Sequence, residues 1–497
     1  MLETLSVVDH MRLPPEGGGT VRALSRIGYE LPAALADLID NSIDAGSSRV
    51  EITFYRDDHE IATVTIADDG KGMNSDELRT GMQFAGKTEH KEGDLGTYGM
   101  GLKSASFSQC NTLTVVSRQN GQTIASRWAA EEIDADWKCA LLDPAGAQVV
   151  FDELCMKGRQ PATGTLVIWE RLDRVGVGAD PDALDEFFST ALPRLNAHLG
   201  LVFHRFLQAG ALSISVSVKH ARRALALPRS VRPIDPFGYQ ASGATDYPKT
   251  LQATIPNVGC VALHAHIWPD GVTSDNFVIG GKRGAEAQGF YFYRNNRLIQ
   301  AGGWNGVLRN EHDGELSLAR VSVDLPPGGL DVNVQKSALQ VTAAQAQTLL
   351  KATDGETDLT GYLDAAKEAY RAARRRTSEA VDPVFVPGAG LATGVRRMAG
   401  RRLGKGLPTQ DITFAWERLE DGKVFELDPI DSRILLNRNY RKAILGEAPA
   451  SAADAPYFKM LLFLTVRNEF ARSRSSKKQN ERLELINELL MDIVKSK

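Results

Sequence analysis

The first clear pattern along the chain predicts an amphipathic helix over residues 31–45, within LPAALADLIDNSIDA. Apolar and acidic residues recur there with the helical period of 100° per residue, so they fall on opposite sides. The apolar side consists of Leu35, Leu38, Ile39 and Ile43. The polar side consists of Asp37, Asp40, Asn41 and Asp44, within roughly 100° of arc. An ordinary surface helix has this pattern, so the pattern alone assigns no chemistry to the acids.

Alternating apolar and polar residues predict strands after this helix. The segment RVEITFYRDDHEIATVTIADDG predicts a strand pair around a polar turn at Arg56–Glu60. A second helix is expected at Ser75–Met82, and the glycine-dense stretch Gly86–Gly101 is expected to be a loop. Further strands are predicted at Thr112–Ser117, Thr123–Ala129, Ala147–Phe151 and Thr165–Arg171.

The pattern changes near residue 175. One or two helices and the strand LSISVSV follow, and later strands are predicted at Val261–Ile267, Gly289–Tyr293 and Leu316–Val323. Residues 339–376 have a helical pattern, and a Gly-, Pro- and Arg-rich stretch at 380–408 precedes a tail that ends in two helices. We therefore expect an N-terminal arm (1–25), a first domain (26–175), a second domain (176–345), a helical exit with a basic linker (346–408) and a C-terminal helical domain (409–497).

Bulk composition agrees with a chain of several globular domains. A length of 497 residues suggests about three domains, and 43% hydrophobic with 24% charged residues is typical of soluble proteins. No run approaches the ~20 apolar residues of a membrane span, so we expect a cytoplasmic protein without membrane contact. The cysteines are widely spaced, which supports neither a zinc module nor a disulfide framework. They are Cys110, Cys139, Cys155 and Cys260.

Positive charge is concentrated in one block although the net charge is −4. Residues 367–405 contain ten Lys or Arg against three Asp or Glu. Such blocks attract phosphate backbones or acidic partners, but they also occur as solvated linkers. The candidate DNA-binding residues are Arg374, Arg375, Arg376, Arg396, Arg397, Arg401 and Arg402.

Two segments near the N-terminus carry residue types suited to a nucleotide. In the predicted helix, Asp37 and Asn41 are one turn apart and therefore neighbours on one face. The segment ADDGKGM contains Asp68, Gly70 and Gly72 at the end of a predicted strand. Glycines there let the backbone turn tightly and approach a flat ring, and a buried aspartate can accept a hydrogen bond from the exocyclic amine of adenine.

Two more segments follow in order. The segment GTYGMGLKSAS has Gly96, Gly99 and Gly101 before Lys103 and a helix-like run, so exposed N–H groups and a helix N-terminus can cradle phosphate. The segment GTLVIW has Thr165 at the start of a strand. Each pattern also occurs in ordinary turns and glycine loops, so their order and spacing carry the weight of the inference.

In order and spacing these segments resemble the GHKL ATPase superfamily, which includes MutL, the 90-kDa heat-shock chaperone, type II topoisomerase ATPase subunits, histidine kinases and Morc proteins. NSIDAG has the form found in MutL- and Morc-like members. The resemblance implies an α+β chain with an α/β sandwich ATPase domain of the Bergerat fold, a ribosomal-S5-like transducer domain and a mainly helical C-terminal domain. It also implies ATP and Mg²⁺ as cofactors.

The resemblance further implies a role for each motif residue. Asn41 would place its amide oxygen on Mg²⁺, Asp68 would receive the adenine amine, and Met73 would pack on the base. The glycine loop and Lys103 would wrap the phosphates, with Lys87 as a further candidate. The implied ATP-binding residues are Asn41, Asp68, Gly70, Gly72, Met73, Lys87, Gly96, Gly99, Met100, Gly101, Lys103 and Thr165.

One position departs from the superfamily pattern. The general base of the family is a glutamate four residues before the asparagine, and here that position is Asp37. The aspartate carboxylate can still polarise the attacking water. The aspartate side chain is one methylene shorter than that of glutamate, however, and a misplacement of about 1 Å can cost ~10²-fold in rate. We therefore expect slow hydrolysis. Asp40 is an alternative base.

Two segments of the second domain extend the resemblance. GGLDVNVQKSALQ is similar to the transducer segment of the heat-shock chaperone and MutL, in which a basic residue reaches the ATP site, and Lys336 matches that residue. A surface lysine after a strand is the alternative. YRNNRLI, with Asn295, Asn296 and Arg297, resembles Morc proteins and is also a plain type I′ hairpin turn.

The whole chain is most similar to a compact prokaryotic Morc-like protein. This similarity implies an ATP-driven homodimeric clamp on DNA, whose ATPase domains associate when ATP is bound, within an antiviral or restriction-like defence system that includes other proteins. A chaperone-like ATPase and a non-hydrolysing ATP-sensing scaffold are the alternatives. The apolar run LLFLTVRNEF in the tail is expected to form a core, dimerisation or docking helix.

Overall fold

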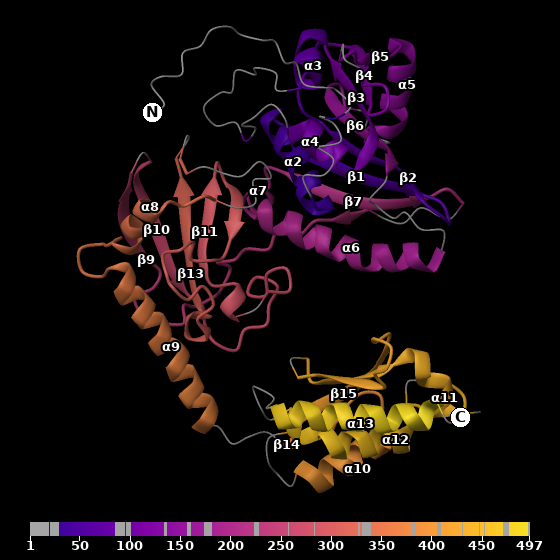
Figure 1. The fold of residues 1–497 in the computed structure, drawn as a ribbon, viewed down its shortest axis with the longest axis vertical. Helices are drawn as coiled ribbons and strands as arrows, with labels where there is room; N and C mark the ends of the chain where they lie inside the picture. Colours follow the sequence, from indigo (N-terminus) through magenta and orange to yellow (C-terminus); the bar gives the residue numbers. More distant parts are fainter. Residues whose placement is uncertain are drawn as a thin grey trace, which may run out of the picture. The chain divides into compact units, whose positions relative to one another are not determined.

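The computed structural model contains two compact units, residues 1–372 and residues 373–497 (Figure 1). It describes residues 19, 29–84, 95, 101–133, 137–156, 161–172, 181–222, 228–256, 258–282, 284–326, 329–330, 339–379, 384–404, 409–429, 431–446, 448–451, 453–470 and 477–495. Within these residues, no helix combines the length and the apolar character that crossing a membrane requires.

Eight strands form the first sheet of the N-terminal unit, in the order β5-β4-β3-β6-β2-β1-β7-β8. They are β1 (Arg49–Arg56), β2 (Ile61–Asp68), β3 (Cys110–Gln119), β4 (Gln122–Ala129), β5 (Ala140–Leu141), β6 (Gly164–Leu172), β7 (Ser213–His220) and β8 (Arg229–Ser230). The predicted hairpin is confirmed, because β1 and β2 pair in antiparallel register. Strand β1 also pairs in parallel with β7, so this sheet continues past residue 175, where we expected the first domain to end.

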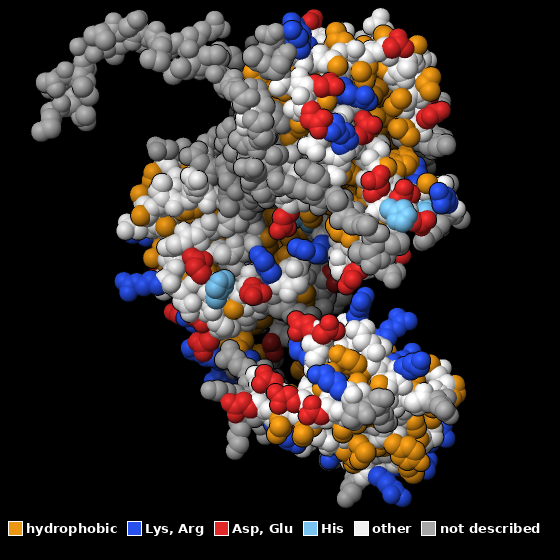
Figure 2. Space-filling model, turned by 45° about the vertical axis from the view of Figure 1, so that its right-hand side comes forward, with side chains coloured by type: hydrophobic (Ala, Val, Ile, Leu, Met, Phe, Trp, Pro, Cys, Tyr) orange, Lys and Arg blue, Asp and Glu red, His pale blue; other side chains and the backbone are white. Residues whose placement is uncertain are grey.

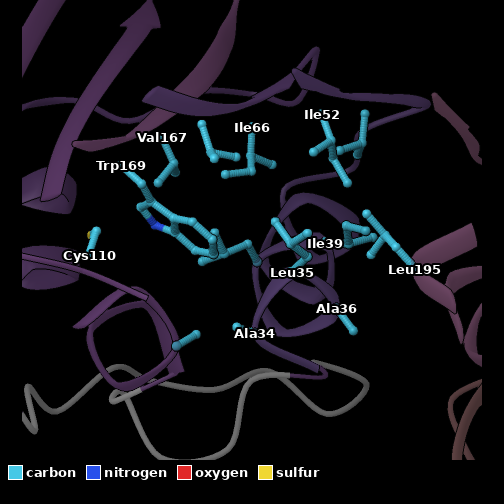
Figure 3. Close-up of a cluster of buried hydrophobic side chains, with 14 of the residues drawn as sticks. Ala34, Leu35, Ala36, Ile39, Ile52, Ile66, Cys110, Val167, Trp169 and Leu195 are labelled. Carbon is cyan, nitrogen blue, oxygen red and sulfur yellow. The ribbon is translucent and has the colours of Figure 1, made fainter. Parts of the chain in front are cut away.

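Helices cover both faces of the first sheet. They are α2 (Leu31–Asp44), α3 (Ser75–Met82), α4 (Gly101–Phe107), α5 (Pro144–Leu154), α6 (Pro181–Val202) and α7 (His204–Gln208). Alternate residues of β6 contact the two layers. Val167 and Trp169 pack in the large core with the apolar side of α2 (Figure 3), whereas Leu166 and Ile168 pack with Phe151 of α5.

The strand predicted at Ala147–Phe151 is wrong, because this segment is the centre of helix α5. The Asp143 side chain caps the helix by accepting the Gly146 N–H at 2.8 Å, and Pro144 follows at the first helical position. Both residues favour a helix start. A short apolar run does not distinguish a strand from a buried helical turn, so the preceding cap was the informative signal.

Helix α3 begins with a capping box that supports a testable prediction. Asn74 accepts the Glu77 N–H at 3.0 Å, and Glu77 accepts the Asn74 N–H at 2.9 Å. We expect Asn74→Ala to lower the free energy of unfolding by about 1 kcal/mol, because two helix N–H groups lose their acceptor. Urea unfolding measures this change. Asn74→Asp keeps the acceptor and is the control, and an equal loss in both variants would contradict the capping role.

Five strands form the second sheet, in the order β12-β11-β13-β10-β9. They are β9 (Lys249–Ile255), β10 (Gly259–Ile267), β11 (Gly289–Arg294), β12 (Arg297–Ala301) and β13 (Ala319–Leu325), with helices α8 (Ala343–Leu350) and α9 (Leu359–Glu379) alongside. Asn295 and Asn296 join β11 to β12 with φ of 47° and 65°. Positive φ at both central residues is what a type I′ turn requires, so the predicted hairpin turn is confirmed.

The C-terminal unit combines its helices with a four-stranded sheet that the sequence did not predict. Its four strands are β14 (Val384–Pro387), β15 (Thr409–Glu417), β16 (Phe425–Asp428) and β17 (Arg433–Asn437), in the order β14-β15-β17-β16. Its helices are α10 (Thr393–Gly404), α11 (Arg441–Leu445), α12 (Pro456–Val466) and α13 (Lys477–Lys495). The segment expected to be a basic linker contains β14 and α10, because β14 pairs with β15 and Phe385 and Leu391 enter the core of this unit.

Candidate active site

Three neighbouring strands place polar side chains in a row at one end of the first sheet. Asp68 of β2 is in register with Thr165 of β6, and Thr165 is in register with Ser117 of β3. The Thr165 N–H donates to Asp68 Oδ1 at 3.2 Å, and the Ser117 and Thr165 hydroxyl oxygens are 3.1 Å apart. Ser117 Oγ also accepts the Met73 N–H at 2.9 Å. Ser117 was missed by the sequence reasoning, because only the strand register brings it here.

Asp68 is buried, and its carboxylate has room for one more donor. Oδ1 accepts the Gly70 N–H at 2.9 Å as well as the Thr165 N–H, and Oδ2 accepts the Ser42 hydroxyl at 3.1 Å. A carboxylate offers about four acceptor positions, so a position remains on Oδ2. The predicted contact with an exocyclic amine is therefore compatible with the bonds that hold this side chain.

Burial raises the pKa of Asp68 from 3.8 to about 6, against the opposing effect of its hydrogen bonds. A raised folded-state pKa means that the folded chain holds the proton more tightly than the unfolded chain. This contribution to stability is complete below pH 3.8 and is lost as the pH rises through 6.

We expect the free energy of unfolding of the wild type, relative to Asp68→Asn, to fall by about 2 to 3 kcal/mol between pH 4 and pH 7. Asparagine has the same shape and can accept the same backbone donors, but it does not titrate. Urea unfolding of both proteins at several pH values measures the difference. A difference that is constant with pH would show that Asp68 does not titrate in this range.

The glycines of ADDGKGM allow backbones to approach closely. Gly72 has a φ of +69°, and a Cβ there would lie 2.0 Å from the Arg118 carbonyl oxygen. A Cβ on Gly70 would lie 2.8 Å from the Ala45 Cβ, just past the end of α2. Both positions therefore need glycine, because any larger residue would push the loop away from β3 and α2.

Helix α2 brings Asp37 and Asn41 to the same site. Asp37 is buried and accepts the Tyr29 hydroxyl at 2.9 Å, whereas the Asn41 side chain is exposed. Burial and the Asp37 charge raise the pKa of Tyr29, so this hydroxyl remains a donor at neutral pH. A Cβ on Gly101 would lie 3.8 Å from Asp37 Oδ2. The carboxylate therefore lies beside the first residue of α4.

Asp40 has a different environment from Asp37. It is fully buried, and Arg297 of β12 donates to its Oδ1 at 2.7 Å. The same guanidinium lies 3.9 Å from Asp37 Oδ1. Asp40 is therefore half of a buried ion pair, an arrangement that suits a structural carboxylate better than the alternative base. The contact of Arg297 with α2 was not predicted, because the two residues are 257 positions apart.

Lys103 lies in α4 and is buried. Its ammonium donates to the Gly81 carbonyl at 2.7 Å, near the end of α3, and burial lowers its pKa to about 8. The structure thus ties Lys103 to α3, and its contact with phosphate stays a prediction. The predicted residues Lys87, Gly96, Gly99, Met100 and Lys336 lie outside the described part of the chain.

The basic block divides between two helices. Arg374 and Arg375 are exposed near the end of α9, and the Arg376 side chain is outside the described residues. In α10, Arg396 donates to the Thr393 hydroxyl at 3.1 Å. Arg397, Arg401 and Arg402 of α10 are exposed. On the face drawn in Figure 2, acidic and basic side chains are interspersed rather than gathered in one basic patch.

The donor set fits a magnesium nucleotide. Mg²⁺ keeps several waters and takes few protein ligands besides phosphate oxygens, and Asn41 offers an exposed amide oxygen beside the Asp37 carboxylate. The Ser42 hydroxyl, next to Asn41 in the chain, donates to Asp68 Oδ2 at 3.1 Å and so joins Asp68 to α2. The residues predicted to bind adenine and the metal are therefore linked through α2.

A comparison with known proteins found a family match over the segment that contains Asp37, Asn41, Asp68 and Ser117. Residues 29–159 match the family model described as histidine kinase-, DNA gyrase B-, and HSP90-like ATPase. The DNA mismatch repair protein MutL of Neisseria meningitidis is 29% identical over 133 residues, which is 25% of this chain and 20% of that protein. MutL of Shewanella baltica is 32% identical over 139 residues, 27% of this chain and 21% of that protein. The chain thus spans about a fifth of the length of the curated relatives it matches.

Proposed function

We propose that this chain binds Mg-ATP and hydrolyses it slowly as a dimeric clamp on DNA. Residues 29–159 match a GHKL-type ATPase family model, and 133 residues of the chain are 29% identical to the DNA mismatch repair protein MutL. The observation that carries the ATPase proposal is the connected row of Ser117, Thr165 and Asp68, which Ser42 joins to α2. This row holds a buried carboxylate that can accept an adenine amine, and Ser42 links it to the helix that carries the Asp37 carboxylate and the Asn41 amide.

Each residue at the site has a separate task in the proposed reaction. Asp68 accepts the adenine amine, and Asn41 holds Mg²⁺, which neutralises phosphate charge when bound. Asp37 takes a proton from the water that attacks the γ-phosphorus, while the bond from that phosphorus to the ADP oxygen breaks. The Tyr29 hydroxyl donates to Asp37 Oδ2 at 2.9 Å and so holds the carboxylate in place. The shorter Asp37 in place of glutamate is the reason that we expect slow turnover.

The dimeric clamp rests on surface features of the C-terminal unit as well as on kinship. Helices α12 and α13 expose large apolar side chains at one-turn intervals, and hydrophobic groups gather on part of this unit in Figure 2. They are Tyr457, Leu461 and Leu464 on α12, and Leu485, Leu489 and Ile493 on α13. Monomeric proteins rarely expose such groups together, so we assign them to a homodimer contact. The exposed arginines of α10 are the proposed DNA contacts.

The forms DLIDNSIDAG, YGMGLKSAS and YRNNRLI favour a Morc-like protein, and we propose a place in an antiviral defence system that includes other proteins. Phage infection of cells that carry the wild type or Asp37→Asn tests this part. Equal plaque numbers with and without the wild-type chain would contradict it.

One set of measurements on the full chain tests the ATPase and the clamp. ATP binding is measured by calorimetry with Mg²⁺, turnover by phosphate release, and mass by light scattering with a non-hydrolysable ATP analogue. Duplex DNA is added at low and high salt, since phosphate contacts weaken steeply with salt. We expect binding, slow turnover, a dimer and salt-sensitive DNA association. A chain that binds no ATP would overturn the proposal.

Two other functions predict different results in the same measurements. The short Asp37 favours a non-hydrolysing ATP-sensing scaffold, which would bind ATP without any phosphate release. The exposed apolar side chains of α12 and α13 favour a chaperone-like ATPase, which would suppress aggregation of an unfolded protein and show no response to DNA.

A further inference from the structure

One buried arginine of the second sheet reaches the acidic helix of the candidate active site. Arg297 begins β12, directly after the Asn295–Asn296 turn, and its side chain is buried. Its Nε donates to Asp40 Oδ1 at 2.7 Å, and its Nη2 lies 3.9 Å from Asp37 Oδ1. A single guanidinium therefore contacts a structural carboxylate and lies beside the proposed base.

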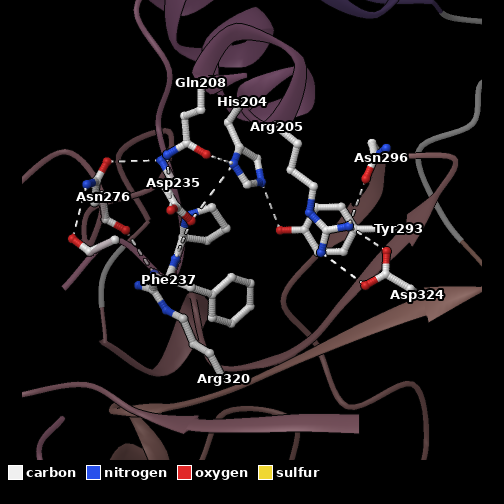
Figure 4. A network of polar contacts seen from close by, with 12 residues as sticks. His204, Arg205, Gln208, Asp235, Phe237, Asn276, Tyr293, Asn296, Arg320 and Asp324 are labelled. Carbon is white, nitrogen blue, oxygen red and sulfur yellow. Dashed lines mark hydrogen bonds and ion pairs between the residues drawn. The ribbon is translucent and has the colours of Figure 1, made fainter. Parts of the chain in front are cut away.

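The hairpin that carries Arg297 is itself held in place by helix α7. Tyr293 of β11 contacts His204 through its hydroxyl at 3.0 Å, and Arg205 stacks over the Tyr293 ring at 3.6 Å (Figure 4). Arg205 also forms an ion pair with Asp324 of β13 at 2.5 Å and lies 3.5 Å from Asn296 Oδ1. These contacts hold β11, β13 and the Asn295–Asn296 turn against α7, and Arg297 directly follows that turn.

We propose that Arg297 is a positioning residue that sets the Asp37 carboxylate for hydrolysis and makes its position depend on the second sheet. This inference rests on the proposed ATPase function. The Asp40 pair fixes the guanidinium, because buried arginine–carboxylate contacts are strongly directional. The more distant Asp37 is then held between the Arg297 charge and the Tyr29 hydroxyl, which leaves an ordered carboxylate at the site. Movement of the second sheet would disturb this geometry.

The position of Arg297 separates this role from nucleotide binding. The residues proposed to hold the adenine ring and the metal are Asp68 and Asn41, whereas Arg297 contacts Asp40 and Asp37 of α2 and the Leu298 carbonyl of its own strand. Loss of the guanidinium is therefore expected to change the rate of the chemical step and to leave ATP affinity nearly unchanged.

Arg297→Met, Asp40→Asn and the double variant test the inference, with kcat, KM and ATP affinity measured for each. We expect Arg297→Met to lower kcat at least tenfold with ATP affinity within about twofold of wild type. The double variant should be no slower than Arg297→Met, because the two residues act as one unit.

Arg56→Met is the matched control. Arg56 is also a buried arginine, and it pairs at 2.5 Å with Asp185 of α6 rather than with an acid of α2. The Arg56→Met variant should lose thermal stability but keep kcat per ATP-binding site within about twofold of wild type. An equal fall of kcat in both arginine variants, or additive losses in the double variant, would reduce Arg297 to a structural role. A kcat of Arg297→Met equal to that of the wild type would overturn only this inference and leave the proposed function standing. A wild-type protein that binds no ATP would overturn both the proposed function and this inference.

Discussion

Asp37→Asn is expected to lower kcat for ATP hydrolysis by about 10³-fold and to change ATP affinity by less than about threefold. Removing a positioned general base typically costs 10²–10⁴-fold in rate. ATP affinity should change little, because no contact between the Asp37 carboxylate and the adenine ring or the ribose is proposed. Asparagine keeps the shape and can still accept the Tyr29 hydroxyl that Asp37 accepts at 2.9 Å. Single-turnover phosphate release measures the rate, and calorimetry measures the affinity.

Two further variants decide whether Asp37 is the base. Asp37→Glu restores the length found in the superfamily and should keep hydrolysis, because the carboxylate is retained. Asp40→Asn should be affected less than Asp37→Asn, since Asp40 is bonded to Arg297 and buried. If Asp40→Asn abolished turnover and Asp37→Asn did not, Asp40 would be the base.

Asn41→Ala is expected to weaken Mg-ATP binding at least ~100-fold. The side chain is exposed on the polar face of α2, where its amide oxygen can enter the magnesium shell. Removal of a metal ligand costs more than removal of its outer partners, which already lowers metal affinity by 10–100-fold. Calorimetry with Mg²⁺ and with EDTA measures both the affinity and its dependence on the metal.

The metal dependence separates this role from a general loss of structure. Without Mg²⁺, Asn41→Ala and the wild type should bind ATP with similar, low affinity. Asn439→Ala, a change at an exposed asparagine of the C-terminal unit, is the control and should bind as the wild type does. Equal weakening of Asn41→Ala with and without Mg²⁺ would contradict the assignment of Asn41 as a magnesium ligand.

Local patterns predicted much of the fold. The α2 helix, the β1–β2 hairpin and the Asn295–Asn296 turn were all predicted, because helical period, strand alternation and turn residues depend on neighbours in sequence. The segment Ala147–Phe151 was mistaken for a strand, since five apolar-rich residues fit both periods. The tail was taken as mainly helical because its short strands are stable only through pairing.

The sequence alone indicated the resemblance to the GHKL ATPase superfamily, which the family match of residues 29–159 supports. It also indicated the candidate site residues, since Asp37, Asn41, Asp68 and the glycines are spaced within short segments. Tertiary structure alone decided which other residues join them. Strand register brings Ser117 and Thr165 to Asp68, and the docking of the second sheet brings Arg297 to α2. These contacts join residues far apart in the chain, and their pairing depends on how whole sheets and helices pack, which no local pattern records.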